Sequence, residues 1–247
     1  MSADTPEISV IIPCKDEAEN ITILMDEIRD ALQGRAFEVV VVDDGSSDGT
    51  GDVVLRRFEA GETWARAVRH ARSAGQSSAV RTGVFAARGA ILVTIDGDGQ
   101  NNPAFIPELV DRLKAGGAKL GMVAGQRQKR TDSLAKRYAS RFANKLRGAM
   151  LKDRTRDSGC GLKAVRAEVF RVLPYFDGWH RYMAALVLRE GYDIDHLDVT
   201  DRPRRFGASK YGIFDRALIG VLDLIGVWWL RRRRKVVPQV SPITPAE

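Results

Sequence analysis

The chain has 247 residues, of which 44% are hydrophobic and 29% charged, with a formal net charge of +7 and an isoelectric point near 9.6. This apolar fraction is enough for a buried core, which excludes a largely disordered chain. The positive charge indicates an anionic partner, which could be nucleic acid, a phosphorylated substrate or a membrane surface. Cys14 and Cys160 form no metal-ligand pattern and indicate reduced thiols in a cytosolic compartment. The first ten residues show no signal-peptide pattern.

Apolar runs alternate with stretches of helical periodicity along the first half of the chain. The expected elements, in order, are a strand at 8–13, a helix at 16–32, a strand at 37–43, a helix at 77–89 closed by Gly89, a strand at 90–96, a helix at 104–117 and a strand at 119–127. A basic helical stretch at 130–151, a loop and helix at 157–173 and an edge strand after Gly191 follow.

The alternation predicts an α/β fold with an open, mostly parallel sheet covered by helices on both faces, because strands this apolar have no solvent-facing side. Three of the strands end in polar clusters, at 13–17, 43–44 and 96–100. Ligands of such sheets bind outside the carboxyl ends of the strands. We therefore expect the three clusters to form one site.

The stretch "TIDGDGQNNP" (94–103) contains two aspartates that alternate with glycines. A calcium EF-hand loop starting at Asp96 would need glycine at its sixth position and glutamate at its twelfth, where Asn101 and Pro107 stand. An EF-hand is therefore excluded. Mg²⁺ or Mn²⁺ fits better, because these cations use one or two protein carboxylates and complete their shell with phosphate and water.

These motifs together resemble the family 2 glycosyltransferases. The resemblance rests on "ISVIIPCKDEAENI", "VVVVDDGSSDGT", "TIDGDGQNNP", "DSGCGLKAVR" and "RRFGASKYG", which occur in order between about residues 7 and 230. The D-x-D-x-Q-x-x-P form and the R-x-x-G-x-S-K motif are similar to the branch that transfers a sugar to a polyprenyl phosphate, such as the dolichol-phosphate mannosyltransferases. Gln76 stands where a lysine is common in the family.

The resemblance implies a nucleotide-sugar-binding domain of the GT-A type and a site for each substrate. Asp96, Asp98 and Gln100 would hold Mg²⁺ or Mn²⁺, with Asp98 central to catalysis and Asp96 orienting the ribose or the metal shell. The nucleoside pocket would be lined by Pro13, Lys15, Glu17, Asp43, Asp96 and Asp98. For Asp43 and Asp48, capping of loop amides is the alternative, and for Asp44 it is the preferred interpretation.

The acceptor implied by the resemblance is a dolichyl or undecaprenyl phosphate, whose oxygen is already anionic and needs no strong base. Cationic groups and a hydroxyl would then bring the phosphate to the sugar, and the candidates are Arg127, Lys163, Arg204, Ser209 and Lys210. The family's chemistry implies inversion in one in-line displacement. The donor is left open between GDP-mannose and a UDP-hexose, and His180 is interpreted as a packed or capping residue rather than a catalyst.

The segment 213–235 predicts an amphipathic helix with paired tryptophans and a basic end, Arg231 to Lys235. Charges interrupt it too often for a spanning helix, so it is expected to lie at an anionic membrane surface, on the cytoplasmic side, as part of a peripheral protein. A buried core or dimer helix is the alternative. The expected organisation is a catalytic domain at 1–212, this helix at 213–235 and a disordered tail at 236–247.

Three other functions were weighed against this one. A family 2 glycosyltransferase acting on a glycan or another non-lipid acceptor in cell-envelope synthesis keeps the same fold, but the basic loop and the tryptophan helix argue against it. A nucleic-acid-binding protein is disfavoured because no basic surface motif interleaved with aromatic residues is present. A silent membrane scaffold is disfavoured by the intact D-x-D-x-Q. An integral-membrane partner remains compatible with the predicted peripheral helix.

Overall fold

The computed structural model describes residues 5–128, 147–203, 214–236 and 238, and the side chains of 214–219 are not part of this description. Among the predicted site residues, Arg204, Ser209 and Lys210 lie outside the described residues. So do most of the predicted basic helix at 130–151, of which 147–151 is helical, and most of the predicted tail.

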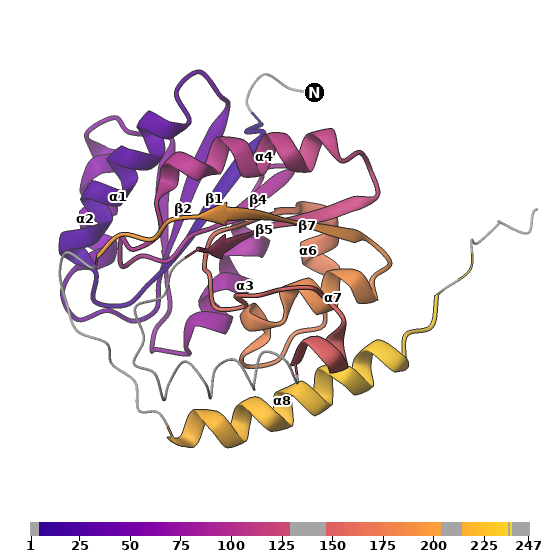
Figure 1. The fold of residues 1–247 in the computed structure, drawn as a ribbon. Helices are drawn as coiled ribbons and strands as arrows, with labels where there is room; N and C mark the ends of the chain where they lie inside the picture. The colour runs from indigo at the N-terminus through magenta and orange to yellow at the C-terminus, as the bar shows by residue number, and fades with distance from the viewer. Residues whose placement is uncertain (1–4, 129–146, 204–213, 237, 239–247) are drawn as a thin grey trace, which may run out of the picture.

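The described residues form a seven-stranded sheet with the strand order β3-β2-β1-β4-β6-β5-β7 (Figure 1). All of its strands run parallel except β6, which is antiparallel to both of its neighbours. The strands are β1 (Ile8–Cys14), β2 (Phe37–Asp43), β3 (Ala65–Arg69), β4 (Ile91–Thr94), β5 (Leu120–Arg127), β6 (Lys163–Arg166) and β7 (Asp193–Val199).

Helices cover both faces of the sheet, as the sequence predicts. On one face lie α1 (Ala18–Ala31), α2 (Thr50–Glu59) and α4 (Ile106–Ala115), and on the other lie α3 (Gln76–Ala86), α6 (Ala167–Val172), α7 (Met183–Arg189) and α8 (Phe214–Arg232). In β2, Val39 and Val41 are buried in the core beneath α1, α2 and α4, while Val40 and Val42 are buried with Ala79 of α3 on the other face. Alternate side chains of one strand are thus buried on opposite faces, which explains the unbroken apolar runs.

The three predicted polar clusters lie at one edge of the sheet, because β2, β1 and β4 are parallel neighbours. The amide of Asp44 donates to the Cys14 carbonyl at 2.8 Å, and the Asp16 amide donates to Ser46 Oγ at 2.9 Å. Two short 3₁₀ helices, Pro103–Phe105 and Trp179–Arg181, follow further along the chain.

Several elements differ from the prediction. The helix that begins near Gln76 ends at Ala86, so Gly89 does not close it. A Cβ at Gly89 would lie 2.7 Å from the Ser9 amide nitrogen, so this residue instead permits close contact with β1. The segment predicted as a loop and helix at 157–173 also contains β6, and β3 and α2 had not been predicted. The edge strand expected after Gly191 is β7, at the end of the sheet.

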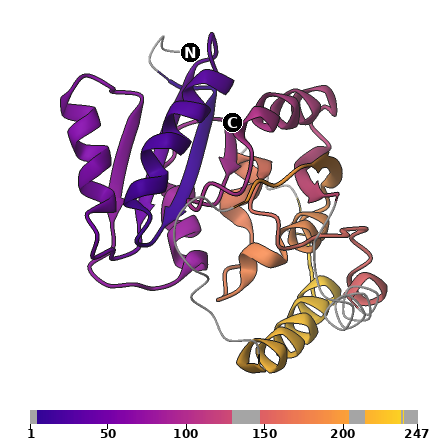
Figure 2. The same cartoon turned by 60° about the vertical axis from the view of Figure 1, so that its left-hand side comes forward.

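Helix α8 lies along the face of the protein that carries α7 (Figure 2). One side of α8 packs against the core shared with α3, α6 and α7, and its other side exposes apolar residues. Leu224 and Val227 are buried, and the Tyr182 hydroxyl donates to the Gly220 carbonyl at 3.0 Å. The exposed apolar stripe consists of Val221, Leu222, Ile225 and Trp229, with exposed fractions of 50%, 61%, 50% and 54%. Among the described residues, no helix combines the length and apolar character needed to cross a bilayer.

Candidate functional site

The acidic loop that follows β4 carries the two aspartates of the predicted metal site. The Asp96 amide donates to Asn101 Oδ1 at 3.3 Å, and the Gln100 amide donates to Asp98 Oδ1 at 3.1 Å. Burial, reinforced by the charge of Asp98, raises the pKa of Asp96 to about 6, while Lys163 and Arg127 oppose this rise. The two carboxylates therefore repel one another, and a divalent cation between them would relieve the repulsion.

The donor set fits a metal that shares its shell with a diphosphate. No group of three or more His, Cys, Asp or Glu side chains suited to a metal ion occurs in the described part of the chain. A closed cage made only of these side chains is thus not present there. Two carboxylates with an adjacent amide oxygen at Gln100 match the sites in which Mg²⁺ or Mn²⁺ takes its remaining ligands from phosphate and water.

Glycines allow the acidic loop to pack tightly against its neighbours. A Cβ at Gly97 would lie 2.5 Å from Cys14 Sγ, and a Cβ at Gly161 would lie 2.3 Å from Asp96 Oδ2. Thr94 Oγ1 also donates to the Gly161 carbonyl at 2.6 Å. The loop before β6 is therefore held directly against the Asp96 carboxylate, and this contact requires the antiparallel pairing of β4 with β6.

Arg127, at the end of β5, is fixed by two carboxylates. Its guanidinium forms a bidentate ion pair with Asp157, in which Nη2 lies 2.9 Å from Oδ1, and Nη1 contacts Asp201 Oδ2 at 3.2 Å. The hydrogen bonds to Asp157 raise the pKa of Arg127 above its usual value. Asp157 belongs to the D-S-G-C-G motif, but its pairing with Arg127 could not be read from the motif.

Lys163 begins β6 and is buried, with 6% of its surface exposed. Its Nζ donates to the Cys160 carbonyl, and its charge acts on Asp96. Burial lowers the pKa of this ammonium group, while the nearby acids oppose the change. A partly desolvated cation beside Asp96 is suited to contact an anionic substrate.

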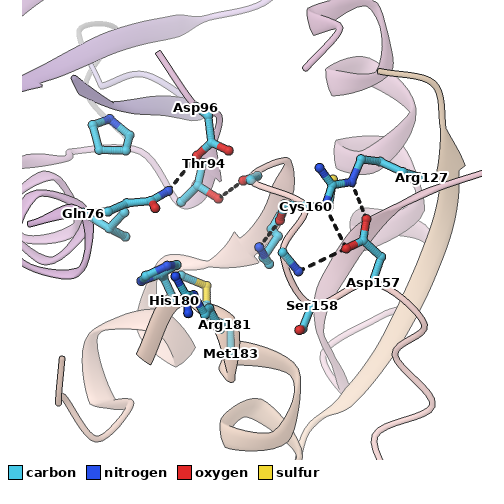
Figure 3. Close-up of a pocket in the computed structure, with 15 residues that line it drawn as sticks. Gln76, Thr94, Asp96, Arg127, Asp157, Ser158, Cys160, His180, Arg181 and Met183 are labelled. Atoms are coloured by element: carbon cyan, nitrogen blue, oxygen red, sulfur yellow. Dashed lines mark hydrogen bonds and ion pairs between the residues drawn. The ribbon is translucent and has the colours of Figure 1, made fainter. Parts of the chain in front are cut away.

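Asp96, Arg127 and Lys163 line a pocket with a volume of about 410 Å³ at the carboxyl edge of the sheet, whereas Asp98 and Gln100 are not among its lining residues (Figure 3). Asp96 and Gln76 lie on one side, joined by a 2.7 Å hydrogen bond from Gln76 Nε2 to Asp96 Oδ1. The pocket is lined by Pro13, Gln76, Val80, Thr94, Asp96, Arg127, Asp157, Ser158, Gly159, Cys160, Gly161, Lys163, His180, Arg181 and Met183. It therefore brings together Pro13, Asp96, Arg127 and Lys163 from four different strands or their ends.

The other predicted nucleoside residues lie at the same sheet edge but do not line this pocket. Asp43 is fully buried, accepts from the Ser46 amide at 2.8 Å and pairs with Arg69 Nε at 2.8 Å. Glu17 Oε2 accepts from Asn20 Nδ2 at 2.6 Å, and Lys15 is exposed. Asp43 therefore caps a loop amide, that of Ser46, which is the alternative role given for it above.

Two further aspartates have structural roles at this edge. Asp44 accepts from the amides of Ala74 and Gly75, each at 2.8 Å, and so fixes the loop before α3. Asp48 accepts from the amide of Ala18 at 2.9 Å, at the start of α1. Both contacts agree with the predicted capping of loop and helix amides.

Arg202 joins the acidic loop to the segment that leads toward Arg204. Its guanidinium pairs with both oxygens of Glu27, at 2.8 and 2.7 Å, and donates to the carbonyls of Gly99 and Asn101, each at 3.2 Å. The Arg202 amide also donates to the Gln100 carbonyl at 2.8 Å. The sequence does not predict the roles of Arg202 and Asp201, because their partners lie between 74 and 175 positions away.

Burial lowers the pKa of His180 to about 3. The folded pKa is thus below the value of about 6.5 expected for the unfolded chain, so this histidine favours folding above pH 6.5, and that contribution decreases as the pH falls toward 3. As the pH is lowered below 6, we expect the unfolding free energy of the wild type to fall more steeply than that of His180→Gln. The difference between the two slopes should reach up to about 1.4 kcal/mol per pH unit. Urea unfolding between pH 4 and 8 would measure both slopes, and parallel curves would contradict the prediction.

The family model described as Glycosyl transferase family 2 matches residues 9–173. The dodecaprenyl-phosphate galacturonate synthase of Rhizobium johnstonii is 33% identical over 92% of this chain and 68% of its own length. The undecaprenyl-phosphate 4-deoxy-4-formamido-L-arabinose transferase of Pectobacterium carotovorum is 31% identical over 85% of this chain and 64% of its own length. The chain thus spans about two thirds of the length of these relatives.

Among solved structures, the glucosyl-3-phosphoglycerate synthase of Mycobacterium tuberculosis, determined with Mn²⁺, UDP-glucose and phosphoglyceric acid, has a TM-score of 0.66. It is 21% identical, and the match covers 92% of this chain and 79% of that one, which shows a shared fold. The family predicted from the motifs is confirmed, and both relatives are named as enzymes of polyprenyl-phosphate sugars, the branch that the motifs resemble. The chain belongs to the family 2 glycosyltransferases.

Proposed function

We propose that this glycosyltransferase moves a sugar from a nucleotide diphosphate sugar to a polyprenyl phosphate, with inversion and with the help of a divalent cation. The observation that carries the proposal is one pocket lined both by Asp96 and by the cationic side chains of Lys163 and Arg127. The names of the two relatives support the lipid acceptor. The names of the two relatives mention different sugars, so they do not identify the sugar that this chain transfers. The proposed donor is GDP-mannose or a UDP-hexose.

In this mechanism Asp96, Asp98 and Gln100 would hold Mg²⁺ or Mn²⁺, which would neutralise charge on the departing diphosphate. Gln76 and the Gly161 backbone orient the Asp96 carboxylate from two sides. Lys163 and Arg127 place positive charge where an anionic acceptor oxygen would approach the anomeric carbon. The acceptor oxygen needs no base because it is ionised, and Arg204, Ser209 and Lys210 remain candidates for binding its phosphate.

The test is transfer of a radiolabelled sugar. Purified protein would be incubated with undecaprenyl phosphate, Mn²⁺ and a panel of labelled UDP and GDP sugars, and lipid-soluble label would be counted after extraction into organic solvent. We expect label from at least one donor and its loss on addition of EDTA. Label appearing only on a soluble glycan acceptor would support the second family activity weighed above, and label unaffected by EDTA would contradict the metal.

We also propose that α8 lies on the cytoplasmic face of an anionic membrane, alone or beside an integral-membrane partner. The exposed apolar stripe of α8 runs toward Arg232 and Arg233, which are exposed. Apolar side chains and adjacent arginines are the pattern of helices that lie at the interface of anionic bilayers. Arg234 differs, because its Nη2 donates to the Glu190 carbonyl at 2.7 Å.

Replacing three stripe residues is expected to release the protein from such membranes. The variant Leu222→Ser/Ile225→Ser/Trp229→Ser should bind phosphatidylglycerol vesicles about 100-fold more weakly in a flotation assay, since each large apolar side chain contributes roughly 1 kcal/mol or more when it enters the bilayer interface. Leu55→Ser on α2 is the control, because Leu55 is 51% exposed but lies on the opposite face of the sheet. Equal binding of all three proteins would refute the proposed orientation.

A further inference from the structure

The pocket wall across from Asp96 has no part in the proposed metal and diphosphate site. It consists of His180 and Arg181, at the end of the 3₁₀ helix, and Met183, at the start of α7 (Figure 3). The backbone here is well fixed, because the Arg181 amide donates to the Gly178 carbonyl at 3.0 Å and its carbonyl accepts from Arg147 Nη2 at 3.5 Å. The backbone of this wall is therefore held in place by hydrogen bonds, as a surface that binds a ligand requires.

His180 lines this pocket, and its imidazole is held by Ser77. Its Nδ1 lies 2.8 Å from Ser77 Oγ, which also accepts from the Gly178 amide at 2.8 Å. Ser77 Oγ uses its remaining hydrogen-bonding capacity best by donating its proton to Nδ1. The imidazole is neutral at physiological pH because burial lowers its pKa, so its single proton is then on Nε2. The nitrogen left for a ligand is an N–H group.

Arg181 adds a charged donor beside it. Its side chain lines the pocket, and no hydrogen bond or ion pair joins its guanidinium to any side chain of the described residues. Its charge acts on Asp223 of α8, but the two form no ion pair. Arg127, in contrast, is already paired with Asp157 and Asp201. Of the two arginines that line the pocket, Arg181 is thus the one without a side-chain partner in the part of the chain that the structure describes.

Two donors side by side, the imidazole N–H of His180 and the guanidinium of Arg181, suit an oxyanion better than sugar hydroxyls. A hydroxyl group both donates and accepts, and its recognition uses acceptors as well as donors, whereas a carboxylate only accepts. We propose that Arg181 and His180 bind a carboxylate on the donor sugar, so that the donor is a nucleotide hexuronate. This inference rests on the proposed function, which places the sugar between the diphosphate at Asp96 and this wall.

The phosphate of the acceptor is the other oxyanion that could reach Arg181. The chain that leads to Arg204 leaves from the opposite side of the site, where Asp201 contacts Arg127 and Arg202 contacts the loop at 99–101. Figure 3 shows Arg127 and Asp157 on a different side of the pocket from His180 and Arg181. Arg127, one of the candidates for the acceptor phosphate, and the proposed carboxylate subsite therefore lie on different sides of the pocket.

Donor binding without any lipid separates the two possibilities. Isothermal titration with Mn²⁺ would compare UDP-galacturonate, UDP-glucuronate and GDP-mannuronate with UDP-galactose, UDP-glucose and GDP-mannose. We expect one hexuronate to bind roughly 10- to 100-fold more tightly than its neutral hexose, the range of a charge-assisted hydrogen bond. Arg181→Gln should bring this ratio near one without weakening the neutral donor, whereas Arg112→Gln, an exposed arginine on α4, should leave the ratio unchanged.

Two results would overturn the inference. One is that no hexuronate binds more tightly than its neutral counterpart. The other is that Arg181→Gln leaves donor binding intact and instead raises KM for undecaprenyl phosphate, which would assign Arg181 to the acceptor. Transfer of a neutral sugar to lipid would keep the proposed function while removing this inference. Tight hexuronate binding that depends on Arg181, without transfer to lipid, would instead support this inference and contradict the proposed function.

Discussion

Asp98→Asn is expected to lower sugar transfer about a thousandfold or more while the protein remains folded. The substitution keeps the size of the side chain and removes the negative charge next to Asp96. If the pair holds the cation that neutralises the diphosphate, several kcal/mol of transition-state stabilisation are lost, and each 1.36 kcal/mol corresponds to a factor of ten in rate. Initial rates with saturating Mn²⁺, together with Mn²⁺ binding measured by electron paramagnetic resonance in the presence of UDP and GDP, would quantify the effect.

Asp111→Asn is the matched control for this substitution. Asp111 lies on α4 and pairs with Arg35 at 2.7 Å on the surface, so its loss removes an equal charge outside the pocket. We expect Asp111→Asn to transfer sugar at the wild-type rate. If Asp98→Asn retained Mn²⁺ binding and transferred sugar as fast as this control, the role assigned to the aspartate pair would be wrong.

Gly161→Ala should produce the second large effect, a loss of transfer of about 100-fold. The new methyl group would lie 2.3 Å from Asp96 Oδ2, so either the Asp96 carboxylate or the loop before β6 must move. A displacement of about 1 Å at a catalytic group is enough for a loss of this size. We also expect a stability loss of about 1–3 kcal/mol, typical of an overpacked buried site, which urea unfolding would measure.

Gly148→Ala distinguishes this steric effect from a general intolerance of alanine. Gly148 lies in the helical segment 147–151, and a Cβ there would meet no atom within 4 Å. We therefore expect this variant to fold and to transfer sugar like the wild type. Wild-type activity of Gly161→Ala would show that Asp96 is not held by the loop before β6.

The sequence predicts best what depends on local patterns. The runs at 8–13 and 37–43 are so apolar that only a sheet buried on both faces accommodates them, and β1 and β2 confirm this. The polar residues that end β1, β2 and β4 share an edge because parallel neighbours end together. Capping of loop amides, the preferred interpretation for Asp44, is likewise a local property, and Asp44 accepts from the amides of Ala74 and Gly75.

What the sequence does not predict depends on contacts between distant segments. β6 has only four residues and follows a loop, so its insertion between β4 and β5 has no local signal. The pairing of Arg127 with Asp157, and of Arg202 with Glu27, joins residues 30 and 175 positions apart. For α8, the sequence predicts an amphipathic helix but not the burial of Leu224 and Val227, because the pattern of one helix does not show which of its sides packs against the rest of the protein.

The position of β6 also determines when the active site can form during folding. β1 to β4 are parallel neighbours joined by helical connections and can assemble as the chain emerges, but the strand that pairs with β4 on its other side lies about 70 residues later. Contacts of such long sequence separation form late, because the intervening chain must be ordered first. Because Gly161 and Lys163 lie in or just before β6, we expect them to reach Asp96 only when β6 pairs with β4 and β5. We expect a nascent chain that ends before β6 to fold β1 to β4 without the contacts that Gly161 and Lys163 make with Asp96.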